Sequence, residues 1–119
     1  AFYGCSGLTS ITIPSSVTTI GDSAFKNCNK LLDVDLGNSI TSIGNSVFEG
    51  CSSLKTIEIG TSVMEIKSNA FSKCKLLENI NVHENNENYK SVNGILYTND
   101  GKELVIYPEG KNLIEILNL

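Results

Sequence analysis

The feature that most constrains this chain is a repeat of 23 residues, which brings similar apolar residues into the same rows. The clearest rows hold phenylalanine, cysteine and leucine: Phe2, Phe25, Phe48 and Phe71; Cys5, Cys28, Cys51 and Cys74; Leu8, Leu31, Leu54 and Leu77. One short repeat cannot bury its apolar face alone, whereas stacked copies bury a continuous core. The sequence therefore predicts a stack of four repeats over residues 1–83, of which the first and last are partial.

Each repeat contains a strand pattern, a turn and a short helical pattern. The segment Leu8–Ile13 ends in alternating apolar and polar residues, which indicates a strand with one buried face. The segment Ala24–Cys28 predicts a short helical turn, and N-cap residues precede this motif in three repeats: Asp22, Asn45 and Ser68. We therefore expect a leucine-rich repeat solenoid of α/β type, mainly β, whose strands form a parallel sheet that ends in a β-hairpin.

The four cysteines occur once per repeat, and this spacing favours a structural role. A zinc site would need short pairs of ligands, whereas a single periodic cysteine is typical of a small buried residue. We expect a ladder of buried free thiols, with a disulfide between neighbouring rungs as the alternative. We likewise expect the four phenylalanines to stack inside the core.

A different pattern follows Val82, where the apolar register is predicted to end. A polar loop is expected over residues 84–88, and a hairpin is expected from two apolar strands, 95–97 and 104–107, around the turn at 98–102. We expect residues 84–110 to form an insert or cap, because the end of a repeat stack must be covered. The apolar tail 111–119 is expected to begin another rung or pack on the hairpin; an exposed docking strip and a cloning remnant are the alternatives.

The rows resemble the BspA-type, or treponemal-type, leucine-rich repeat family. Its pattern is close to C-x-x-L-x-x-I-x-I-P-x-S-V-x-x-I-G-x-x-A-F-x-x-C, which Cys5 through Cys28 matches nearly throughout. Gly37 and Gly60 replace the proline in later repeats, and Val47 replaces the alanine. The resemblance implies a bacterial or protozoan cell-surface or secreted protein used for adhesion, with extracellular-matrix proteins such as fibronectin as ligands of some members.

Composition argues against several functions. The net charge is −4 and the chain contains no arginine, which argues against a nucleic-acid partner. No apolar run is long enough to span a membrane. The single histidine, His83, has no recognisable catalytic partner and is expected to serve a surface or capping role, so we expect no enzyme activity, metal or cofactor.

The predicted sheet has an outward face of alternating polar residues, which is the candidate ligand face. Its members are Ser10, Thr12, Asp33, Asp35, Thr56, Glu58, Asn79 and Asn81. One hypothesis is that this concave face binds a protein ligand, through an acidic surface that attracts a basic partner or a cation. The alternative is a solvated face on a structural spacer that has no ligand of its own.

The first repeat begins at Ala1 in mid-pattern, so we expect the chain to be a fragment of a longer protein. An uncovered first rung predicts end-to-end self-association or fraying of residues 1–20.

Overall fold

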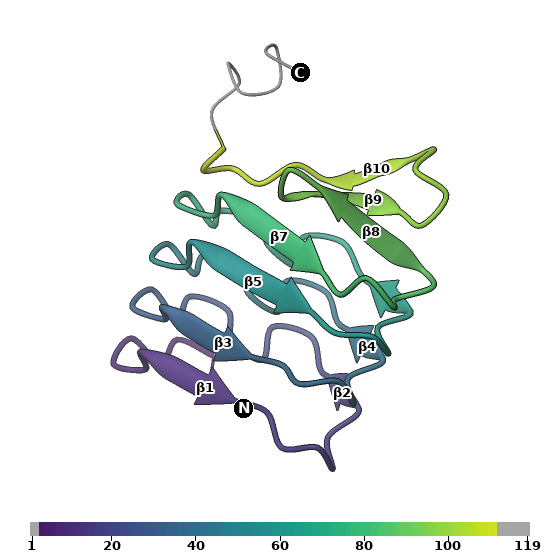
Figure 1. Ribbon diagram of the computed structural model, residues 1–119. Coiled ribbons are helices and arrows are strands. Elements are labelled where there is room, and N and C mark those ends of the chain that lie inside the picture. Colours follow the sequence, from purple (N-terminus) through teal and green to yellow (C-terminus); the bar gives the residue numbers. More distant parts are fainter. Residues whose placement is uncertain (1–2, 112–119) are drawn as a thin grey trace.

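Successive repeats lie one above another as rungs of a stack (Figure 1). The computed structural model describes residues 3–111, and within that range it contains ten strands and no helix. The first column of strands is β1 (Ser10–Thr12), β3 (Asp33–Asp35), β5 (Thr56–Ile59) and β7 (Asn79–Val82). The second column is β2 (Thr19–Ile20), β4 (Ser42–Ile43) and β6 (Glu65–Ile66).

Strands of neighbouring rungs pair in parallel, one repeat apart. Ile11 lies opposite Val34, and Ile57 lies opposite Ile80. The prediction of a parallel sheet is confirmed in part, because the first column consists of two pairs, β1–β3 and β5–β7, while β2, β4 and β6 form one sheet. Strands β3 and β5 contact each other, but no hydrogen-bonded ladder joins them among the described strands.

The prediction of a short helical turn was wrong. The amide of Ala24 donates to Gly21 O at 3.2 Å, but the amides of Ser23 and Phe25 donate to the next rung, to Asn45 O at 2.8 Å and Val47 O at 3.0 Å. In an α-helix, each of these amides would donate to the carbonyl of the residue four positions earlier in the same chain segment. Ser23 has a φ of 59°, in the left-handed region, which interrupts a right-handed helix at this point.

The predicted N-cap role of Asp22, Asn45 and Ser68 was also wrong, since there is no helix to cap. The Oδ1 atom of Asp22 accepts from the amide of Asn45 at 2.8 Å, and Oδ1 of Asn45 accepts from the Ser68 hydroxyl at 3.2 Å. These side chains therefore link consecutive rungs.

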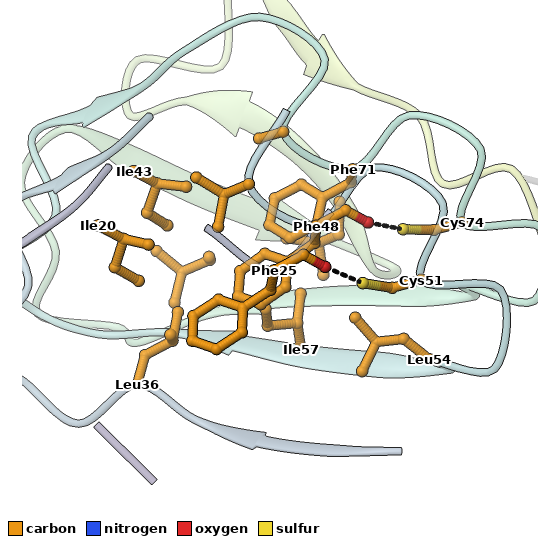
Figure 2. Close-up of a cluster of buried hydrophobic side chains, with 14 of the residues drawn as sticks. Ile20, Phe25, Leu36, Ile43, Phe48, Cys51, Leu54, Ile57, Phe71 and Cys74 are labelled. Atoms are coloured by element: carbon orange, nitrogen blue, oxygen red, sulfur yellow. Dashed lines mark hydrogen bonds between the residues drawn. The ribbon is translucent and has the colours of Figure 1, made fainter. Parts of the chain in front are cut away.

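The predicted stack of phenylalanines is confirmed within the described residues; Phe2 lies outside them. The rings of Phe25 and Phe48 are 5.6 Å apart between centroids and 6° from parallel, and those of Phe48 and Phe71 are 5.7 Å and 5° (Figure 2). All three are buried among the isoleucines and leucines of the repeats.

The cysteines are free thiols, as predicted, and three of them, Cys28, Cys51 and Cys74, are fully buried. Their thiols also form bonds that the spacing did not reveal. The Sγ atom of Cys51 donates to Phe25 O at 3.2 Å, and that of Cys74 donates to Phe48 O at 3.0 Å (Figure 2). Each of these two cysteines thus satisfies a carbonyl of the preceding rung.

The prediction that the register ends after Val82 was wrong for two residues. Asn86 lies 23 residues after Val63 and is 2% exposed, and its Nδ2 donates to Val63 O at 3.1 Å. Tyr89 lies 23 residues after Ile66, and its hydroxyl accepts from the Ile66 amide at 3.0 Å. Polar side chains therefore continue the stack where the repeat pattern calls for apolar ones.

The last strands form an antiparallel sheet over the end of the stack (Figure 1). They are β8 (Tyr89–Val92), which the sequence analysis missed, and the predicted hairpin pair β9 (Ile95–Thr98) and β10 (Leu104–Ile106). Asn93 and Gly94 turn between β8 and β9 with φ of 53° and 79°.

We propose that residues 84–110 act as a cap on the repeats of 1–83. Their contacts with the last rung support this role, because Gly94 O accepts from the amide of Ile80 at 2.8 Å and the hydroxyl of Ser91 accepts from the amide of Val82 at 2.9 Å. The carboxylate of Glu109 likewise accepts from the amide of Lys73. Of the tail 111–119, residues 112–119 lie outside the described residues.

Candidate ligand face

The outward side of β1, β3, β5 and β7, called the strand face here, carries the side chains predicted to contact a ligand. Alternation places them there, because every second residue of each strand is part of the core. On β5, Ile57 and Ile59 are each 1% exposed, while Thr56 and Glu58 between them are exposed. The other strands follow the same alternation, although the inward Ile11 and Val34 of β1 and β3 are only half-buried.

Two polar columns run across the strand face. Six of the predicted side chains are exposed: Ser10, Thr12, Asp33, Asp35, Thr56 and Glu58. Asn79 and Asn81 on β7 are half-buried. Asn79 lies under the β8–β9 turn, where a Cβ added to Gly94 would be 2.1 Å from its Oδ1.

The carboxylates of the strand face are opposed by neutral side chains within each pair of strands. Asp35 lies opposite Thr12, and Glu58 lies opposite Asn81. Like charges directly opposite would be destabilising, and the register avoids this within the ladders. Asp35 and Glu58 are one repeat apart, on either side of the boundary between β3 and β5.

Two hollows indent the strand face. The middle hollow, of about 540 Å³, is lined by residues from β1, β3 and β5, including Thr12, Asp33 and Thr56. The end hollow, of about 250 Å³, lies where β3, β5 and β7 end, and its lining includes Asn81. Asp35 and Glu58 line both hollows, so they occupy the centre of the strand face.

Several residues that line these hollows were not predicted from the sequence. His83, expected in a surface or capping role, is exposed and lines the end hollow, and its Nδ1 accepts from the Asn85 amide at 3.0 Å. Its place could have been found from the period, because His83 follows Gly60 by one repeat, and both line the same hollow. Leu32 and Lys55 line the middle hollow. Leu32 adds an exposed apolar side chain, and Lys55 adds a positive charge beside the carboxylates.

The carboxylate of Asp35 fixes the turn after β3, because its Oδ1 accepts from the Gly37 amide at 3.0 Å. Among residues 3–111, no group of three or more histidine, cysteine or acidic side chains is arranged to hold a metal ion. In the same range, no helix has the length and apolar character needed to cross a membrane.

Comparison with known families decides the class of repeat. A family model described as "BspA type leucine rich repeat region" matches residues 1–99. The chain belongs to the BspA-type leucine-rich repeat family. The match extends past residue 83 through the end of β9, in agreement with the rung positions that Asn86 and Tyr89 occupy.

Solved structures with the same fold are bacterial leucine-rich repeat proteins. The pneumococcal vaccine antigen PcpA is 32% identical, with a TM-score of 0.77 over 88% of this chain and 26% of PcpA. A leucine-rich cell surface protein of Faecalibacterium prausnitzii is 32% identical, with a TM-score of 0.75 over 90% of this chain and 28% of that protein. A leucine-rich repeat protein of Eubacterium ventriosum is also 32% identical, with a TM-score of 0.72 over 93% of this chain and 35% of its own.

This chain therefore spans roughly a quarter to a third of the proteins that it resembles. A search of curated proteins gave no match.

Proposed function

We propose that this BspA-type repeat chain is a protein-binding module of a cell-surface or secreted protein, and that its strand face contacts the ligand. The observation that carries the proposal is the pair of hollows centred on Asp35 and Glu58. They combine exposed carboxylates with polar and apolar neighbours, which suits a protein surface that offers basic side chains.

The similar proteins support the proposed location at the cell surface or outside the cell. One is a pneumococcal vaccine antigen and another is a cell surface protein. We extend that location, and a role in adhesion, to this chain. We also propose that the module performs no catalysis, because the described hydrogen bond of the His83 imidazole at the end hollow is to a backbone amide, that of Asn85, and not to a carboxylate or a nucleophilic side chain.

The experiment reverses two charges on the strand face and compares them with two reversed elsewhere. The test variant is Asp35→Lys with Glu58→Lys. The matched control is Glu87→Lys with Glu103→Lys, which changes net charge equally on exposed side chains of the 84–110 segment. Binding is measured to immobilised extracellular-matrix proteins, fibronectin among them, with circular dichroism as a check of folding.

We expect the strand-face variant to bind at least about tenfold more weakly while the control binds like the wild type. Equal binding by both variants would exclude the strand face as the contact. If the wild type binds none of these proteins, the alternative of a structural spacer is favoured, and exposed substitutions should then have no effect on binding.

A further inference from the structure

The end hollow contains one titratable side chain that is not a carboxylic acid, that of His83. Asp35 and Glu58 are the other titratable side chains of its lining, which lies within residues 3–111 and contains no lysine. His83 follows Asn81 by two residues, so the alternation that places Asn81 on the strand face also places His83 there. The imidazole is therefore an exposed neighbour of the two carboxylates on which the proposed ligand contact is centred.

The hydrogen bond from the Asn85 amide fixes the protonation state of this imidazole. A backbone amide can only donate, so the 3.0 Å bond requires a lone pair on Nδ1 of His83. The neutral ring therefore carries its proton on Nε2, and a second proton can be added only at Nδ1. Protonation of His83 thus breaks the bond to Asn85 and adds a positive charge to the end hollow.

The backbone holds His83 beside the hollow in both states. Its amide donates to Ile59 O at 2.9 Å, and its carbonyl accepts from the Asn86 amide at 3.0 Å. The loop after β7 adds two exposed carboxylates, those of Glu84 and Glu87, outside the lining of the hollow. Histidine is the side chain that ordinarily changes charge between pH 5 and 8, whereas carboxylic acids do so at lower pH. In this range we therefore expect the charge of the end hollow to change through His83.

We propose, on the basis of the proposed function, that His83 is a further ligand-binding residue of the strand face and that its protonation weakens contact with a basic ligand. While the imidazole is neutral, Asp35 and Glu58 give the end hollow its charge. The imidazolium offsets one of these negative charges. A positive charge about 4 Å from a ligand ammonium weakens binding about fivefold in water. Contact with the ligand is therefore stronger at pH 8 than at pH 5.5.

Two-dimensional NMR of the ligand-free chain tests the first step. His83 is the only histidine of the 119 residues, so its ring signals are identified directly. As the pH falls from 8 to 5.5, the Asn85 amide signal should move with the same midpoint as the ring protons. In the matched variant His83→Asn, Oδ1 can accept from the same amide but does not titrate, so this signal should stay constant. An Asn85 amide that does not follow the ring in the wild type would overturn the proposal.

A hexalysine peptide with blocked termini tests the second step at low ionic strength, because its ammonium groups keep their charge throughout this range. The amide signals of Asp35 and Glu58 report binding at the strand face. We expect the Kd from these signals to be about fivefold higher at pH 5.5 than at pH 8 in the wild type, and equal at both pH values in His83→Asn.

Three results of the peptide titration would overturn the proposal. They are equal affinity at the two pH values in the wild type, the same pH dependence in His83→Asn, and no response of the Asp35 and Glu58 amides at pH 8. Binding of matrix proteins by the wild type at pH 8 tests the proposed function separately. A chain that binds a matrix protein equally well at both pH values would retain the proposed function and lose this role of His83.

Discussion

Phe48 provides the most direct test of the repeat core, because its ring lies between two others. It is fully buried, with the rings of Phe25 and Phe71 at 5.6 Å and 5.7 Å between centroids. Truncation of a buried phenylalanine to alanine costs about 3–5 kcal/mol through lost transfer energy and the cavity left behind. Two stacked neighbours place Phe48→Ala toward the upper end of that range, at about 4–5 kcal/mol.

Phe71→Ala is the matched comparison. Phe71 stacks on Phe48 at one face and also lines a separate hollow of about 280 Å³ between its rung and β10. Phe71→Ala therefore removes one described ring contact, whereas Phe48→Ala removes two. We expect the loss of unfolding free energy to be about 1 kcal/mol smaller for Phe71→Ala than for Phe48→Ala.

Urea unfolding followed by tyrosine fluorescence is the assay, since the chain has four tyrosines and no tryptophan. The dependence of unfolding free energy on urea should be recorded for each variant, because a damaged central rung can uncouple the two ends of a repeat stack. A loss below about 1 kcal/mol for Phe48→Ala would refute the assignment of the phenylalanines to the core.

Three further predictions concern features that the period alone did not reveal. Asn86→Ala should destabilise the fold by about 2–4 kcal/mol in urea unfolding, because it leaves the carbonyls of Gly60 and Val63 without this donor; an unchanged midpoint would contradict this. Burial raises the pKa of the Cys51 thiol from 9.0 to about 12, so the contribution of this thiol to stability should be constant below pH 9 and fall by about 1.4 kcal/mol per pH unit between 9 and 12. The slope should be smaller in Cys51→Ala, and equal slopes would refute this source of pH dependence. The Cys51 thiol should react with a maleimide in urea, where the chain is unfolded, and much more slowly in native buffer. Equal rates of labelling under the two conditions would contradict its burial.

The sequence predicted the core well because a fixed period places equivalent residues in equivalent surroundings. The rows of Phe48 and Cys51 could be assigned to the interior without any structure. The backbone of the turns could not be assigned, because Ser23 and Asn27 adopt positive φ and the period does not show which amides bond to the next rung. The same reason explains the N-cap error at Asp22, whose side chain bonds across rungs.

The end of the repeats was misjudged because apolar character was used as the criterion for register. Asn86 and Tyr89 keep their places in the stack through polar contacts with the rung below. On the strand face, alternation predicted the exposed columns, but the hollows depend on side chains from three rungs. His83 belongs to one of them only because the end of β7 lies above Gly60.

Photo-crosslinking tests the central claim, that the strand face binds a protein ligand, most directly. A photoreactive amino acid would replace Thr56, in the middle hollow, and in a second variant Met64, which is exposed beside the second strand column. Each variant would be irradiated with whichever immobilised matrix protein the wild type binds. If the ligand contacts the strand face, cross-linked product should form from position 56 and little should form from position 64. Equal yields, or product from position 64 alone, would contradict it.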